Sequence, residues 1–425
     1  MVSVDSLVIW LKGEPVARVE RDPRGRLSLT YLDVTFDRFD LGAPVLSVSL
    51  PLVRTSYPNA LTRDFLDNLL PEEPARSILA ARFRLGPSDT FGLLDELGEE
   101  CAGALVIQHL DTQPPPVCSD PSLATPVDDT TVSSLLQALP QSPLGVGNGV
   151  RISLAGAQPK LLLTRLEDGR WALPTGGVPS THILKPPIAD QRFPFSVDNE
   201  YFCMRLASNV GLAVAEVERL EFGTIPVLAI KRFDRRWEDG KLFRVHQEDT
   251  CQSLGLPVTR KYQAYGGPSL RQIAGLLSEY GTHDDLISLL ELVTFNVVIG
   301  NCDAHGKNFT LLHLPEGIRL APGYDLMSTL CYAQHDKQMG MFIDSIQTVD
   351  RVRPERIVRE ATSWGMTHGE ATQTVHALLA RLPESVEATI SEVGIPNEAL
   401  NRVIQAQQVE LLAPQQPHKR IHFDM

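Results

Sequence analysis

Three polar residues in a fixed order constrain this chain more than any other feature of its sequence. Asp303 and Asn308 stand five positions apart in the loop NCDAHGKNFT, and Asp325 follows seventeen positions later in PGYDL. One such residue alone usually forms a turn or a cap. The ordered set is typical of phosphoryl transfer, in which one carboxylate orients the attacking hydroxyl while an amide oxygen and a second carboxylate hold metal ions on the nucleotide phosphates. The loop follows Leu286–Ile299, which is apolar on nearly all sides, so we expect a central buried helix before the candidate catalytic loop.

Composition argues against several other classes of protein. The chain has 425 residues, a length that is enough for two or three domains. Since 43% of the residues are hydrophobic, it can bury a sizeable core. Its net charge of −13 disfavours a dedicated nucleic-acid binder, which needs a basic face, although a local basic patch stays open. The six cysteines are scattered without a CxxC pair or a His/Cys cluster, which suits a reducing compartment and argues against structural zinc. We find no signal peptide and no apolar run of the ~18–20 residues that span a membrane, so we expect a cytoplasmic protein.

The first region, residues 1–112, has mixed α/β patterning. We expect strands at 6–11, 17–20 and 27–31, an extended apolar piece at 44–53, helices at 61–70, 76–83 and 91–98, and a closing strand at 102–107. No residue of this region carries recognisable chemistry by itself. We interpret it as a packing or docking domain.

The composition changes at 113–149, which holds repeated prolines with many Ser, Thr and Asp residues. Low apolar content and frequent proline are typical of a linker, interrupted here by a short helix at 131–139. We therefore place a domain boundary in this segment.

A second unit begins at residue 150, and its patterning predicts an α+β fold. Residues 150–237 predict strands at 161–166, 171–173 and 182–185, a helix at 199–209, and strands at 214–221 and 225–232. Residues 238–425 form a mostly helical lobe, with helices expected at 269–279, 284–300, 353–364, 368–381 and 396–412.

Upstream of the catalytic loop, two features suit a nucleotide. Lys185 ends a strand and can bind phosphates, with Glu200 on the following helix as its orienting partner. An edge-strand lysine and a helix-start glutamate also occur for purely structural reasons. The loop 153–158, SLAGAQ, has small residues that let backbone amides approach an anion, although a tight turn between strands explains it equally well.

Two residues inside the catalytic loop have alternative roles. His305 either orients the catalytic aspartate or hydrogen-bonds the backbone. Lys307 either neutralises the transferred phosphoryl group or holds the loop.

Taken together, the quoted motifs resemble the HipA family of serine/threonine protein kinase toxins. The resemblance is carried by SLAGAQPKLLL, HILKP, NEYFCMRLAS, KRFDRRW, HQEDTCQSLGLP, GNCDAHGKNFTLL and PGYDLMS, with FGLLDELGEECAGAL in the N-terminal region. It covers about residues 6–385, and its motifs are many and ordered.

The resemblance implies a variant protein-kinase fold with two lobes, an N-terminal mixed α/β subdomain and a mostly helical C-terminal lobe. Asp303 would be the catalytic base, and Asn308 and Asp325 the magnesium ligands. The other residues implied to contact ATP are Ser153, Leu154, Ala155, Gly156, Ala157, Gln158, Lys185, Lys231, Phe233, His305 and Lys307. Lys231 and Phe233 would offer backbone groups to adenine.

The resemblance also implies self-inactivation. Ser153 matches the serine that HipA proteins autophosphorylate, an event that expels the phosphate loop. A phosphoserine there would repel the nucleotide phosphates. Because Leu154–Gln158 has few apolar anchors, we expect little packing to oppose the release.

The family's partners and substrates set further expectations. The protein substrate would be an aminoacyl-tRNA synthetase, notably glutamyl-tRNA synthetase, whose phosphorylation arrests growth and gives dormant, drug-tolerant cells. The partner would be a dimeric helix-turn-helix antitoxin of the HipB type, through which the chain reaches operator DNA as co-repressor. This chain departs from some relatives at Pro159 and Gly306, and we expect neither to remove a functional group.

Two other functions compete with this one. A small-molecule phosphotransferase of the aminoglycoside-kinase type uses a similar Asp-to-Asn spacing, but the SLAGAQ loop and the N-terminal region argue against it. A catalytically dead co-repressor is the second alternative, and the intact Lys185, Asp303, Asn308 and Asp325 argue against it.

Overall fold

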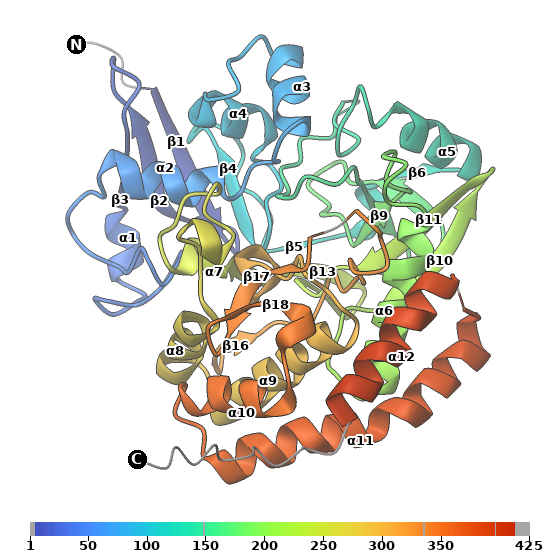
Figure 1. Cartoon of the computed structure of the whole chain (residues 1–425). Helices are drawn as coiled ribbons and strands as arrows, with labels where there is room; N and C mark the ends of the chain where they lie inside the picture. The colour runs from blue at the N-terminus through green and yellow to red at the C-terminus, as the bar shows by residue number, and fades with distance from the viewer. Residues whose placement is uncertain (1–4, 148, 335, 396, 413–425) are drawn as a thin grey trace.

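The chain forms an N-terminal α/β region, a six-stranded sheet and a mostly helical lobe, drawn respectively in blue to cyan, in green, and in yellow to red in Figure 1. The computed structural model describes residues 5–147, 149–334, 336–395 and 397–412. Residues 413–425, which the sequence assigned to the helical lobe, lie outside the described residues.

The N-terminal region is built on a four-stranded antiparallel sheet in the order β3–β2–β1–β4. Its strands are β1 (Asp5–Leu11), β2 (Glu14–Arg21), β3 (Leu27–Tyr31) and β4 (Leu105–Gln108). Lys12 and Gly13 join β1 to β2, both with the positive φ that a tight hairpin turn requires. The helices α1 (Asp33–Phe36), α2 (Asn59–Asp67), α3 (Ala75–Arg82) and α4 (Thr90–Leu97) share one hydrophobic core with the sheet.

The predictions for this region are confirmed to within a few residues, with one exception. The apolar piece 44–53 forms no strand, although Val45, Leu46, Leu50 and Leu52 are buried in the core. It contacts the helical lobe, where the Val48 N–H donates to Glu248 Oε1 at 3.0 Å and the Ser49 hydroxyl donates to Gln252 O at 2.6 Å.

The second sheet has the order β10–β11–β9–β7–β8–β6. It contains β6 (Thr125–Val127), β7 (Leu161–Arg165), β8 (Trp171–Leu173), β9 (His182–Lys185), β10 (Val217–Phe222) and β11 (Ile225–Lys231). Between β9 and β10 runs α6 (Ser196–Asn209). The predicted succession of strands around one helix is confirmed, and it places β9 between two hydrogen-bonded neighbours.

The segment 113–149 is not a linker, contrary to its composition. β6 pairs with β8 at the edge of the second sheet, and α5 (Asp129–Ala138) follows it with Asp128 as N-cap. Val132, Leu136 and Leu139 are buried against the sheet. The linker prediction was wrong for two reasons. Pro126 lies in an edge strand, where a missing N–H is tolerated. In addition, three buried apolar residues are enough to attach one short helix to the sheet.

Short elements that the sequence did not predict complete this part. β5 (Cys118–Ser119), β12 (Arg235–Glu238) and β13 (Lys241–Arg244) form a small sheet in the order β12–β13–β5. Pro121–Leu123 forms the 3-10 turn η1.

The helical lobe surrounds α9 (His283–Val298), most of whose residues are buried, as the sequence predicts. The other helices are α7 (Thr250–Ser253), α8 (Leu270–Tyr280), α10 (Pro354–Thr362), α11 (His368–Val393) and α12 (Glu398–Leu412). Small sheets are formed by β14 (His246–Asp249), β15 (Thr310–Leu314) and β16 (Gly317–Leu320), and by β17 (Gln338–Ile343) and β18 (Ile346–Thr348). The 3-10 turns are η2 (Gln263–Tyr265), η3 (Gly306–Asn308) and η4 (Val349–Arg351).

The last long helix corrects one boundary. α11 was expected to end at residue 381, yet it continues through Pro383 to Val393. Proline removes one helical hydrogen bond. Burial of Leu379, Leu382 and Val386 on both sides of it outweighs that loss. Within the described residues, no helix combines the length and apolar character needed to cross a bilayer.

Candidate active site

Lys185, at the end of β9, lies between two carboxylates. Its ammonium donates to Glu200 Oε1 at 2.7 Å and to Asp325 Oδ1 at 2.6 Å. Glu200 comes from α6, so this contact joins the helix to the sheet. Burial alone would lower the pKa of Lys185, but the charges of Asp325 and Glu200 outweigh it and raise the pKa above its ordinary value. The lysine is therefore a permanent cation in this site.

Asp325 also faces Asn308. Asn308 Nδ2 donates to Asp325 Oδ2 at 2.8 Å, while its Oδ1 accepts from the His305 N–H at 3.0 Å. Burial would raise the pKa of Asp325, but the Lys185 ammonium holds it well below its usual range. Asp325 has a φ of +58°, an uncommon conformation for a residue other than glycine and one that clusters at functional sites.

The donor set fits Mg²⁺. A carboxylate and an amide oxygen are hard donors, and Mg²⁺ usually takes one or two protein oxygens together with phosphates and water. Asn308 presents its nitrogen to Asp325 here, so holding a metal requires the amide to turn its oxygen to that side. Across the part of the chain that the structure describes, no group of three or more His, Cys, Asp or Glu residues could hold a metal ion.

Asp303 is exposed at the start of the catalytic loop. Its N–H donates to Asn301 Oδ1 at 3.0 Å, and its Oδ1 accepts from the Tyr262 hydroxyl at 2.7 Å. The charges of both Asp303 and Asp325 act on His305, so the two carboxylates lie near the same histidine.

The structure places the side chains of His305 and Lys307 in different surroundings. His305 is buried with its ring edge-on to Tyr262 at 5.0 Å, and burial lowers its pKa. Its Nδ1 has no hydrogen-bond partner among the described residues. Lys307 is tied by its ammonium to Asp249 Oδ2 at 2.5 Å and to Asn68 Oδ1 at 2.8 Å. These contacts favour the role of holding the loop for Lys307.

The phosphate loop starts inside the protein. The Ser153 N–H donates to Glu100 O at 2.8 Å, and its hydroxyl donates to Leu69 O at 2.7 Å. Ser153 is fully buried, and Leu154 packs in the N-terminal core. The expectation that little packing opposes release of Leu154–Gln158 is therefore wrong for Leu154, and Ser153 before it is held in place as well.

Lys160 closes the phosphate loop from below. Its ammonium donates to Ala155 O at 2.8 Å, and burial together with the positive charge of Lys185 lowers its pKa to about 8. Gly156 has a φ of +111°, and a side chain there would collide with this ammonium. The loop thus combines small residues with a lysine ammonium next to them, a combination that is compatible with an anion site.

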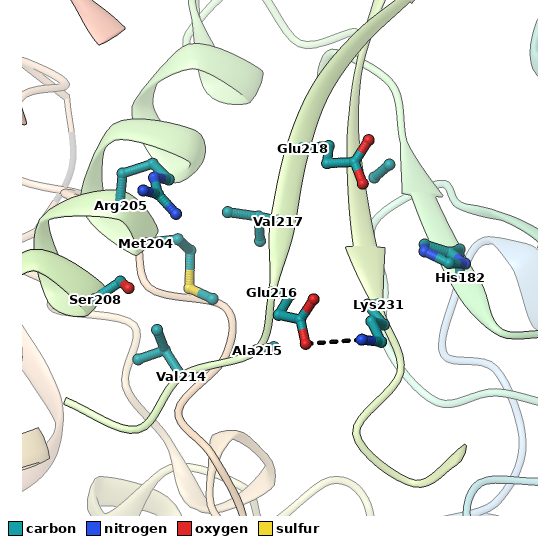
Figure 2. A pocket seen from close by; sticks show the side chains of 11 residues that line it. His182, Met204, Arg205, Ser208, Val214, Ala215, Glu216, Val217, Glu218 and Lys231 are labelled. Atoms are coloured by element: carbon teal, nitrogen blue, oxygen red, sulfur yellow. Dashed lines mark hydrogen bonds and ion pairs between the residues drawn. The ribbon is translucent and has the colours of Figure 1, made fainter. Parts of the chain in front are cut away.

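Lys231 and Phe233 lie where β11 leaves the sheet. The Lys231 N–H donates to Glu216 O at 2.9 Å, so this N–H is already bonded within the protein, and the Phe233 ring packs on Tyr324 at 5.5 Å. The Lys231 ammonium pairs with Glu216 and lines a pocket of about 190 Å³ between α6, β10 and β11 (Figure 2). This pocket is lined by none of Lys185, Asp303, Asn308 and Asp325, so it is distinct from the candidate active site.

A buried ionic network ties the N-terminal region to the same turn. Arg232 donates to Glu100 Oε1 at 2.8 Å and to Asp234 Oδ2 at 2.8 Å, and Arg235 donates to Glu100 Oε1 at 3.0 Å. These side chains are 2–5% exposed. Glu100 therefore connects the start of the phosphate loop to the turn after β11.

Sequence reasoning missed four residues that border the site. Asn68 and Glu72 belong to the N-terminal region, where no chemistry was visible, and Tyr262 carries no local signal. Lys160 does carry a local signal, since a lysine directly after a glycine-bearing loop is typical of phosphate sites. These four residues contact the phosphate loop or the catalytic loop.

Family models match both the N-terminal region and the rest of the chain. A model of the HipA-like C-terminal domain matches residues 152–390, and one of the HipA N-terminal domain matches residues 7–108. Y4mE of Sinorhizobium fredii, which carries a kinase name, is 38% identical over 398 residues, 92% of each chain. The serine/threonine-protein kinase toxin HipA of Shewanella oneidensis is 29% identical over 363 residues, 81% of each chain.

A solved structure agrees over an even greater length. A chain in the complex of Shewanella oneidensis HipA, HipB and operator DNA superposes with a TM-score of 0.79 and 26% identity, covering 96% of both chains. The α+β, two-lobed arrangement is that of the protein-kinase-like class. Within this class the chain belongs to the HipA family, which it matches in both its N-terminal and its C-terminal domain. Its relatives are named as kinases.

Proposed function

We propose that this chain is an ATP-dependent serine/threonine protein kinase that acts as the toxin of a toxin–antitoxin pair. The observation that carries the proposal is the double contact of Lys185 with Glu200 and Asp325, with Asn308 on the other oxygen of Asp325. Lys185 would hold the nucleotide phosphates in this arrangement. Asn308 and Asp325 would hold Mg²⁺, which neutralises phosphate charge, and Asp303 would accept the proton of the substrate hydroxyl.

Phosphate transfer from labelled ATP is the direct test. The purified chain is added with ATP and Mg²⁺ to a host lysate, and new phosphosites are identified by mass spectrometry. Serine or threonine sites that appear with the wild type and not with Asp303→Ala support the proposal. Label that enters only small molecules would instead indicate the aminoglycoside-kinase type of activity.

We extend the proposal to an aminoacyl-tRNA synthetase, such as glutamyl-tRNA synthetase, as the protein substrate. Its support is the family membership of the chain. Phosphorylation of a synthetase would starve translation and arrest growth. Purified glutamyl-tRNA synthetase that stays unmodified while another lysate protein is phosphorylated would redirect the substrate assignment and leave the kinase proposal standing.

A helix-turn-helix antitoxin dimer of the HipB type is the proposed partner. Its support is that the similar HipA of Shewanella oneidensis was solved together with HipB and operator DNA. With a net charge of −13, this chain would reach DNA only through that partner. In a gel shift at physiological salt, the isolated chain should leave operator DNA unshifted, and the complex should shift it.

We also propose self-inactivation through Ser153, and the environment of this residue supports it. The hydroxyl is fully buried and donates to a carbonyl oxygen. A phosphate adds about −1.5 to −2 charges and removes that donor, so it would face the Leu69 carbonyl with negative oxygens. The modified loop would have to leave its site. Mass spectrometry after incubation with ATP and Mg²⁺ tests this proposal, which fails if Ser153 stays unmodified while a protein substrate is phosphorylated.

A further inference from the structure

The segment 261–268, between α7 and α8, lies directly on the catalytic loop. The Gly306 N–H donates to Lys261 O at 3.0 Å, and the Tyr262 ring lies edge-on to His305. Pro268 packs so closely on Gly306 that a Cβ at residue 306 would lie 2.5 Å from its ring. The departure at Gly306 therefore lets this segment approach the loop.

The Tyr262 hydroxyl reaches the proposed catalytic base. It donates to Asp303 Oδ1 at 2.7 Å, and no second side-chain donor contacts this carboxylate within the described residues. An exposed carboxylate rotates freely about its last bond. The hydrogen bond fixes one oxygen and so leaves Oδ2 in a defined direction for a substrate hydroxyl.

The same segment is anchored to the N-terminal region. The Lys261 ammonium pairs with Glu72 Oε2 at 2.7 Å, with both side chains less than one-fifth exposed. The Glu72 N–H in turn makes a long contact of 3.4 Å with Gly156 O in the phosphate loop. One short stretch of chain thus contacts the catalytic loop and, through Glu72, is connected to the phosphate loop.

We propose that Tyr262 is a positioning residue for phosphoryl transfer, whose phenol orients Asp303 while the Glu72–Lys261 pair holds the tyrosine in place. The inference rests on the proposed kinase function. It predicts a defect in the transfer step and none in nucleotide binding, because Tyr262 contacts the base and lies outside the Lys185–Asp325–Asn308 cluster.

Steady-state kinetics of the full chain test the role of the phenol. Tyr262→Phe keeps the ring and loses the donor, so kcat should fall about 10- to 100-fold while the KM for ATP stays within about twofold. A merely structural ring would leave kcat unchanged. The control is Tyr265→Phe, because Tyr265 lies on the same segment with 73% of its surface exposed, and its kcat should equal that of the wild type.

Rescue separates the donor from the shape of the side chain. Incorporation of 4-aminophenylalanine at position 262 restores an N–H donor and should recover most of kcat, whereas 4-methylphenylalanine should not. Equal rates for these two proteins, or an unchanged kcat in Tyr262→Phe, would overturn the inference. A wild type that transfers no phosphate to any protein would instead overturn the proposed function, and the inference with it.

Discussion

The phosphate loop and the catalytic loop are attached to the rest of the protein in different ways. The phosphate loop, 153–158, is held by hydrogen bonds to uncharged main-chain carbonyl oxygens, with Ser153 donating to those of Glu100 and Leu69. The catalytic loop, 301–308, is held in addition by an ion pair between the mostly buried side chains of Lys307 and Asp249.

This difference separates a loop that can be released from one that stays in place. A typical hydrogen bond contributes only about 1 kcal/mol net, so a change at Ser153 can upset the balance for the phosphate loop. Breaking a buried ion pair by removing one partner costs about 3–5 kcal/mol. The four predictions below test this contrast.

Asp303→Ala should produce the largest loss. Removal of the proposed base should lower kcat about 10²- to 10⁴-fold, because the carboxylate that would accept the proton is lost. Since Asp303 is exposed, the midpoint of thermal unfolding and the affinity for ATP should stay near wild type. Asp168→Ala, in an exposed turn, is the matched control. Wild-type transfer by folded Asp303→Ala would remove this residue from the mechanism.

Lys307→Met tests how the catalytic loop is held. Leaving the mostly buried Asp249 carboxylate without its cation should cost up to about 3–5 kcal/mol and lower the midpoint of thermal unfolding measured by calorimetry. Lys337→Met is the control, because that lysine forms an exposed pair with Asp350 and such pairs contribute at most about 1 kcal/mol. A stable Lys307→Met protein with a raised KM for ATP would assign the lysine to phosphate binding instead.

Phosphorylation of Ser153 should release one loop and leave the other in place. We expect faster hydrogen exchange over 153–160, weaker ATP binding, and unchanged exchange over 301–308. Ser153→Ala should keep transfer activity, since the hydroxyl only donates to Leu69 O, although the unpaired carbonyl should cost about 1–3 kcal/mol of stability. Equal loosening of both loops would contradict the contrast.

The sequence predicted those site residues whose contacts come from neighbouring segments of the chain, and missed contacts between distant segments. Lys185 and Glu200 belong to adjacent elements, and Asn308 and Asp325 belong to successive loops, so their order along the chain was informative. Asn68 and Lys307 are 239 positions apart, and such a contact leaves no local pattern.

The fold shows the same limit. Helices and alternating strands were predicted to within a few residues, whereas β12, β13, β17 and β18 were missed, and three of these strands have only three or four residues. The continuation of α11 through Pro383 and the packing of 113–149 were missed because tertiary burial overrode local composition.

The smallest expected effect comes from Lys160, whose protonation should make ATP binding at the phosphate loop depend on pH without involving the catalytic loop. Its pKa is lowered to about 8, so close to half of the side chains are neutral at that pH. ATP phosphates would favour the ammonium form, so binding should take up protons near pH 8 and weaken by a few fold as pH rises further. The same shift has a consequence for folding: because the unfolded chain holds this proton up to about pH 10.4, the Lys160 contribution to the free energy of unfolding rises with pH between about 8 and 10.4.

Calorimetric titration of the protein with ATP at pH 8, in two buffers of different protonation enthalpy, measures the proton uptake. Lys160→Met should abolish it, while Tyr262→Phe, which alters only the catalytic loop, should leave it intact. Binding of ATP to the wild type without proton uptake would show that Lys160 does not sense the phosphates.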